Sequence, residues 1–136
     1  MSRTVHEWSL AEAVIRYVKG VVGERGGSRA RLVVLKLGRL QSIDREVFEF
    51  ALRELSRSEG VEIGELRMIE EDPVLRCRRC GYTWTVDMSR VSEDVAEAIH
   101  FVPEVVHSFF KCPRCGSRDF EVVKGRGVYV ERVEVE

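Results

Sequence analysis

The chain has 136 residues and a formal net charge of −1, from 22 basic and 23 acidic side chains. This near-neutral total excludes bulk electrostatic capture of nucleic acid or of an anionic membrane. No apolar run reaches the roughly 20 residues that cross a bilayer. Glu7 and Glu12 interrupt any apolar segment near the start, so the sequence predicts no signal peptide and we expect a cytoplasmic protein.

The first half of the chain predicts two helices and two strands. Apolar residues at helical spacing predict a helix over 8–23, and a continuous apolar run predicts a strand at 30–38. Asp44 is the expected N-cap of a second helix that runs to Ser56, and a second strand follows at 61–71. The expected apolar faces are Leu10, Ala13, Val14, Tyr17, Val18 and Val21 in the first helix, and Val47, Phe50, Ala51 and Leu55 in the second.

The second half is divided at Pro73. Residues 74–120 contain all four cysteines and a short predicted helix near 92–99. Strand character returns at 121–135, where Gly125 and Gly127 indicate a turn or bend.

This order of elements predicts an α+β fold. We expect the last strand to join the first two in a small three-stranded sheet with both helices on one face, so that the cysteine module is an insertion. The predicted division is an α+β domain from 1–72 and 121–136, and a second, cysteine-containing domain from 73–120. Exchange of the last strand or of the module between two chains would give a homodimer. The sequence is therefore consistent with a monomer and with an exchanged homodimer.

Two Cys-x-x-Cys pairs predict a metal site, and their members are Cys77, Cys80, Cys112 and Cys115. Two residues between thiolates let one tight turn present both sulfurs about 2.3 Å from a zinc ion. Gly81 and Gly116 follow the pairs, where the backbone must fold back. We predict a closed, structural four-thiolate zinc site in a zinc-ribbon-like module, with two redox pairs or four free thiols as the alternatives. His107 is either a fifth or alternative ligand or a hydrogen-bonded surface histidine.

The whole chain resembles the HypA family of nickel metallochaperones, which mature [NiFe] hydrogenases. The resemblance covers the chain from His6 to its end. It rests on the two cysteine pairs, on His6-Glu7-Trp8, on Leu37-Gly38-Arg39-Leu40-Gln41 and on Phe120-Glu121-Val122-Val123-Lys124-Gly125-Arg126-Gly127-Val128-Tyr129. The segment 99–107 is similar to the archaeal branch of the family.

In that family the chain begins Met-His-Glu, and the resemblance implies that the terminal amine, the histidine amide and the imidazole hold nickel. Such a nitrogen set suits square-planar Ni(II). His6 matches this histidine, and Glu7 tunes the site or contacts a partner. His100 matches a histidine that can join the nickel site in archaeal relatives. The alternative for His100 is a helix-end histidine that the helix dipole stabilises.

The sequence departs from the family because residues 1–5 precede His6. An amine at Met1 is too far along the chain to form the usual chelate ring. A start at Val5, from a GUG codon read as methionine, would restore Met-His-Glu. We expect the extended chain to bind nickel more weakly or in an altered way.

The resemblance implies a carrier, with Zn(II) as a structural ion and Ni(II) as the transported ion. Its expected partners are a HypB-type nucleotide-hydrolysing accessory protein and the large subunit of [NiFe] hydrogenase, with no nucleic acid and no membrane. The chain contains no Walker A loop and no evident nucleophile set, so we expect no enzymatic activity. The alternatives are a zinc-ribbon nucleic-acid-binding protein and an adaptor protein. Against nucleic-acid binding, acidic residues in the same module offset the basic residues near the cysteines.

Overall fold

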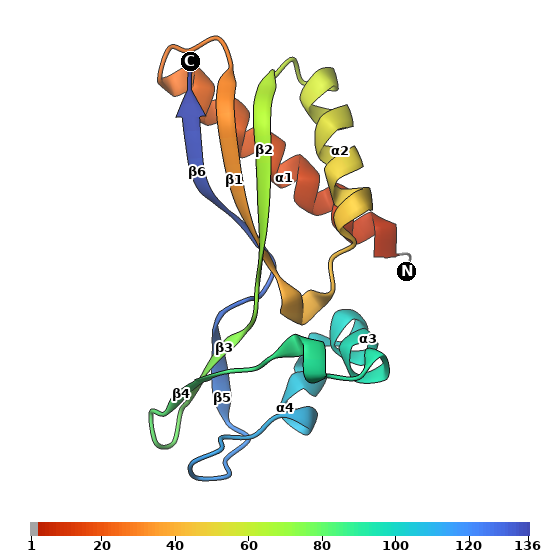
Figure 1. Ribbon diagram of the computed structural model, residues 1–136, viewed down its shortest axis with the longest axis vertical. Coiled ribbons are helices and arrows are strands. Elements are labelled where there is room, and N and C mark those ends of the chain that lie inside the picture. Colours follow the sequence, from red (N-terminus) through yellow and green to blue (C-terminus); the bar gives the residue numbers. More distant parts are fainter. Residues whose placement is uncertain (1–2) are drawn as a thin grey trace. The chain divides into compact units, whose positions relative to one another are not determined.

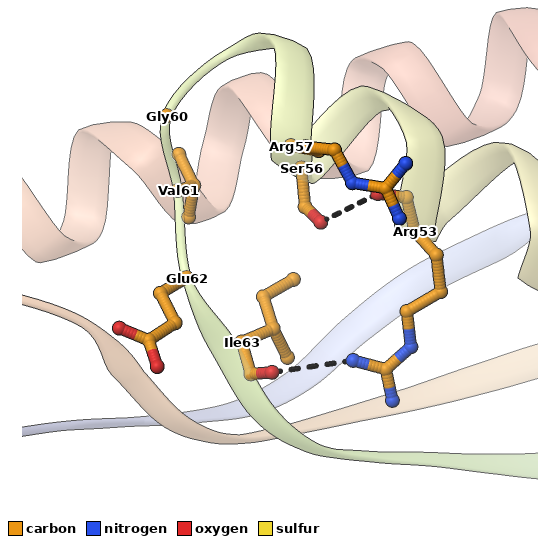
Figure 2. Close-up of a pocket in the computed structure, with 7 residues that line it drawn as sticks. All are labelled: Arg53, Ser56, Arg57, Gly60, Val61, Glu62 and Ile63. Atoms are coloured by element: carbon orange, nitrogen blue, oxygen red, sulfur yellow. Dashed lines mark hydrogen bonds between the residues drawn. The ribbon is translucent and has the colours of Figure 1, made fainter.

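The structure is a computed structural model that describes residues 3–136, with side chains from His6 onward (Figure 1). The chain forms two compact units. Unit 1 comprises the described part of Met1–Lys36 together with Ile43–Ile69 and Val128–Glu136, and unit 2 comprises Leu37–Ser42 and Glu70–Gly127. The predicted second domain, 73–120, is the central part of unit 2, which extends further at both ends and also takes in the short segment after the first strand.

Helix α1 (Arg3–Glu24) begins before the predicted first residue, so His6 and Glu7 lie inside the helix and not ahead of it. Its buried face consists of Glu7, Ala11, Val14, Ile15 and Val18. These positions repeat at helical spacing, as the predicted ones did, but the buried face is rotated about the helix axis relative to the predicted face. Ala13 and Tyr17, which were expected in the core, are exposed, because apolar residues occupy more than one side of this helix and packing selects among them.

Helix α2 (Arg45–Ser58) begins as predicted, because the Asp44 carboxylate accepts a hydrogen bond of 3.1 Å from the Val47 amide. The predicted apolar face is wrong in two respects. Leu52, which it omitted, is fully buried. Phe48 is buried, whereas Phe50 is 59% exposed and meets Trp8 edge-to-face with the ring centroids 6.1 Å apart. Helices α1 and α2 pack against each other in unit 1.

The sheet of unit 1 has the order β2-β1-β6, from β1 (Ala30–Gly38), β2 (Ile63–Glu71) and β6 (Val128–Val135). The Glu136 amide donates to the Arg29 carbonyl at 2.9 Å, and the Gly38 amide donates to the Gly127 carbonyl at 2.7 Å. Strands β1 and β6 are therefore antiparallel. The prediction that the last strand joins the first two in one sheet is confirmed.

Unit 2 contains a second three-stranded sheet, in the order β4-β3-β5. Its antiparallel strands are β3 (Val74–Cys77), β4 (Thr83–Thr85) and β5 (Phe120–Lys124). The stretch expected to be one interrupted strand thus divides at Gly125 and Gly127 between the two sheets. The helical segments of unit 2 are η1 (Arg39–Gln41), η2 (Met88–Arg90), α3 (Glu93–Phe101), η3 (Pro103–Val105) and α4 (Val106–Phe109).

The core of unit 2 joins segments that are far apart in the sequence. Its buried members are Leu40, Leu75, Ile99, Val106 and Phe120, one from each of η1, β3, α3, α4 and β5. The residues between the two cysteine pairs are therefore anchored by their own apolar contacts. No helix among the described residues is long and apolar enough to cross a membrane.

Two glycines allow the chain to pass close to itself in unit 2. A Cβ atom on Gly38 would lie 2.3 Å from the carbonyl carbon of Gly125. Gly125 has a φ of +86°, and a Cβ atom there would lie 2.3 Å from the Pro73 Cα. The Gly125 carbonyl also accepts a 3.1 Å bond from the Leu40 amide, so this close approach fixes the position of η1.

Candidate metal centre

The first cysteine pair is shaped by a tight turn after β3. The Cys80 amide lies 3.4 Å from the Cys77 sulfur, and the Gly81 amide donates to the Cys77 carbonyl at 2.9 Å. Gly81 has a φ of +79°, which confirms the expected backward fold. The Cys77 amide donates to the Tyr82 carbonyl at 2.8 Å. The turn thus holds both sulfurs of the pair on its inner side.

The second cysteine pair repeats this pattern bond for bond. The Cys115 amide lies 3.5 Å from the Cys112 sulfur, and the Gly116 amide donates to the Cys112 carbonyl at 2.9 Å. Gly116 has a φ of +77°, and the Cys112 amide donates to the Ser117 carbonyl at 2.8 Å. We call each of these turns a knuckle: residues 77–81 and residues 112–116.

The two knuckles bring four sulfur atoms within 4.8 Å of one another. The Cys77 and Cys115 sulfurs are 3.5 Å apart, and the Cys80 and Cys112 sulfurs are 3.6 Å apart. A disulfide bond would require about 2.05 Å. A tetrahedral zinc ion with bonds of about 2.3 Å separates its sulfur ligands by about 3.8 Å. The arrangement is therefore a four-cysteine metal site that is compatible with zinc.

The electrostatics of the four thiols differ from one sulfur to the next. The hydrogen bond from the Cys80 amide outweighs burial and lowers the pKa of Cys77 to about 6. At Cys115 the Ser117 amide favours the thiolate, but burial and the three neighbouring sulfurs raise the pKa to about 11. Without a cation, charge on one sulfur opposes charge on the others. A bound dication would remove this repulsion.

His107 lies near the knuckles but outside the sulfur cluster. Its Nδ1 is 2.8 Å from the Arg118 carbonyl oxygen, and its ring centroid is 4.4 Å from that of Phe120. The Arg118 guanidinium in turn donates to the Ser108 carbonyl at 3.0 Å. His107 is therefore a hydrogen-bonded residue that fastens α4 to the segment following the second knuckle.

The residues considered for nickel have contrasting environments. His6 is exposed on the first turns of α1, whereas the Glu7 side chain is fully buried. His100 is 6% exposed in the last turn of α3. Its Nδ1 is hydrogen-bonded to the main-chain oxygen of Gln41, and Phe101 contacts its ring edge-to-face with the centroids 5.2 Å apart. His6 and Glu7 belong to unit 1, whereas His100 belongs to unit 2 with the four cysteines.

Two of these features were not predicted from the sequence. The burial of Glu7 depends on the helix beginning before it, and the carbonyl partner of His100 is a main-chain atom distant in the sequence. The first could have been found from the apolar face, since Glu7 lies four residues before Ala11 and seven before Val14.

A family model described as "Hydrogenase/urease nickel incorporation, metallochaperone, hypA" matches residues 5–135. The chain belongs to the HypA family. The hydrogenase maturation factor HypA of Pyrococcus horikoshii is 46% identical over 134 residues, covering 97% of this chain and 96% of the relative. The HypA of Pyrococcus furiosus is 44% identical over the same length, with the same shares of each chain covered.

The fold agrees with solved HypA structures. The solution structure of the Ni metallochaperone HypA from Helicobacter pylori superposes with a TM-score of 0.67, covering 96% of this chain and 97% of that chain. Its sequence is 17% identical, so this match concerns the fold alone. A second solution structure of a HypA protein has a TM-score of 0.65. The predicted family and the predicted α+β class with its cysteine module are confirmed.

Proposed function

We propose that this HypA protein binds Ni(II) and delivers it to the large subunit of [NiFe] hydrogenase during maturation. The observation that carries the proposal is the family match, which spans both His6-Glu7 and the four cysteines. The Pyrococcus relatives are named as hydrogenase maturation factors, and the Helicobacter protein is named as a nickel metallochaperone. Urease is a second proposed client, since the family description includes it.

For nickel we assign His6 as the principal ligand, because its imidazole is exposed and accessible to an incoming ion. Glu7 is fully buried, so we assign it an indirect role in holding the start of α1 and not a bond to nickel. A carboxylate is in any case a hard ligand for square-planar Ni(II). His100 stays a proposed additional ligand only because the resemblance implies it.

For the four cysteines we propose zinc as the resident ion. Four thiolates leave no open coordination position, so the ion supplies a cross-link and charge compensation and no catalysis. It would hold the first knuckle, at the end of β3, to the second knuckle, which precedes β5. Its proposed role is to maintain the sheet of unit 2.

We further propose that a HypB-type nucleotide-hydrolysing protein acts with this chain. The sequence contains no Gly-x-x-x-x-Gly-Lys-Ser/Thr motif that would bind a nucleotide phosphate. Any nucleotide hydrolysis during delivery would therefore belong to the partner. In this scheme the protein is a carrier and not an enzyme.

Metal analysis of purified variants tests the proposal. We expect one zinc ion per chain, and a nickel affinity that falls at least about tenfold in His6→Ala. His107→Ala is the matched control, since it also removes an imidazole but should leave nickel affinity unchanged. Unchanged nickel binding in His6→Ala would refute the assigned site. Retention of an oligonucleotide at physiological salt, without nickel binding, would favour the zinc-ribbon alternative.

The extension before His6 allows a second test. Nickel is titrated into chains that begin at residue 1 and at residue 5, with the rest of the sequence unchanged. We expect tighter binding when a single residue precedes His6, because its amine then completes the chelate. Equal affinity would show that the terminal amine takes no part.

A further inference from the structure

Four basic side chains on or directly beside the knuckles form an exposed surface that the proposed nickel function does not use. We call it the knuckle patch, and it consists of Arg78, Arg79, Lys111 and Arg114. Each of these residues is next to a cysteine of the sulfur cluster, so the convergence of the sulfurs within 4.8 Å also brings the basic residues to one end of unit 2. Figure 1 shows both knuckle loops at this end, away from α3.

The knuckle patch is poorly compensated by acidic groups. Arg78 lies 3.9 Å from the Asp119 carboxylate, and its charge also acts on Glu121. Within the part of the chain that the structure describes, no ion pair of 4.0 Å or less involves the other three members. Two nearby arginines have different roles, since Arg76 pairs with Glu121 and Arg118 donates to carbonyls at the end of α4.

Opposite charges are separated along unit 2. Segments 76–82 and 111–121 carry six basic and two acidic side chains, whereas 83–110 carries one basic and five acidic side chains. A zinc ion with four thiolates has a net charge of −2, which leaves the knuckle end positive. Most of the acidic residues that balance these cations in the net charge of the chain therefore lie in α3 and η3.

We propose that the knuckle patch is a docking surface for an acidic segment of a partner protein. Exposed guanidinium groups bind carboxylates in a directional, bidentate way. A short acidic segment matches a patch of four cations. A nucleic acid is a poorer match, because a strand that extends beyond the patch would approach the acidic residues of 83–110.

The test uses the full, zinc-loaded chain and a fluorescent peptide of ten glutamates, with binding followed by anisotropy at low and at physiological salt. The patch variant is Arg79→Glu/Lys111→Glu/Arg114→Glu. The control variant is Arg16→Glu/Lys19→Glu/Arg57→Glu, which changes the net charge equally on exposed positions of α1 and α2. We expect the patch variant to bind at least about tenfold more weakly and the control to change less than about twofold.

Zinc content is measured for every variant, and Arg79→Gln/Lys111→Gln/Arg114→Gln serves as a milder version if the reversals disturb the knuckles. Saturable peptide binding that only the patch variants lose supports the proposal. Equal weakening in patch and control variants overturns it, because the attraction would then follow net charge alone. Tighter binding of an oligonucleotide of equal charge, or no saturable peptide binding, also overturns it.

Discussion

The imidazole of His100 is hydrogen-bonded to the main-chain oxygen of Gln41, although 59 positions separate the two residues in the sequence. Gln41 ends η1, and His100 is in the last turn of α3. Leu40 and Ile99, their immediate neighbours, meet in the core of unit 2. His100 is therefore part of the packing of unit 2, whatever its role toward nickel.

The first prediction separates folding from nickel binding. His100→Ala should lower the free energy of unfolding by about 1–3 kcal/mol, because it removes a buried hydrogen bond and packed atoms. His6→Ala should change it by less than about 0.5 kcal/mol, since His6 is exposed. Urea unfolding of the zinc-loaded proteins measures both values. Equal stability of the two variants would contradict a structural role for His100.

The second prediction concerns removal of the metal. Cys77→Ser should bind less than one zinc ion per chain, and the amides of β3 and β5 should exchange faster with solvent, because the cross-link between the knuckles is lost. Hydrogen exchange with mass spectrometry measures this change, and a zinc chelator added to the unaltered chain should reproduce it. Full zinc content in Cys77→Ser would show that the four sulfurs do not act together.

The third prediction concerns the close backbone approach of Gly38. Gly38→Ala should destabilise the protein by about 2–4 kcal/mol, since the new methyl group would lie 2.3 Å from the Gly125 carbonyl carbon and main-chain atoms cannot rotate away. Thermal unfolding followed by circular dichroism measures the loss.

Two other glycines provide controls for this prediction. Gly20 has open space around its Cα, so Gly20→Ala in α1 should stabilise the protein by about 0.5–1 kcal/mol. Gly60 also has open space but has a φ of +69°, so Gly60→Ala should cost about 1 kcal/mol through backbone strain alone. A loss in Gly38→Ala no larger than in Gly60→Ala would argue against steric exclusion.

The fourth prediction concerns Arg76 and Glu121, which lie opposite each other on β3 and β5. The Arg76 side chain donates a hydrogen bond to Glu121 and adds a favourable charge, so the pKa of Glu121 is lower than usual. The stability that this pair contributes is present above the ordinary pKa of glutamate and is lost as pH falls through the lower folded value. Arg76→Ala should raise the pKa of Glu121 back toward the ordinary value of a glutamate side chain. Titration of its carboxyl carbon by NMR measures this, and an unchanged midpoint would contradict the pairing.

Local sequence signals predicted the beginnings of several elements. Asp44 acts as the expected helix cap, because a carboxylate before an apolar run satisfies a free amide directly. The glycines after each cysteine pair adopt the positive φ that a knuckle requires. Such features depend only on residues that are close in the sequence, so they can be predicted from a short segment of it.

Features that depend on distant packing were not predictable in the same way. Phe48 and Phe50 both fit an apolar face of α2, and only contact with α1 and the sheet decides which one is buried. The sequence from β5 through β6 resembles one interrupted strand, but β5 and β6 join different sheets. The resemblance to the HypA family named His6 and Glu7 as proposed nickel residues, without indicating that one would be exposed and the other buried.

The matching hydrogen bonds of the two knuckles have a consequence for insertions and deletions. Each knuckle closes within itself, through bonds that end at Tyr82 in one and Ser117 in the other. The sulfur geometry therefore places no demand on the number of residues between the knuckles. That number is restricted by the packing of the segment itself, which must place Ile99 and Val106 in the core and His107 beside Arg118. Sequence drift can lengthen or shorten this segment at its exposed turns while the coordination of the metal stays the same.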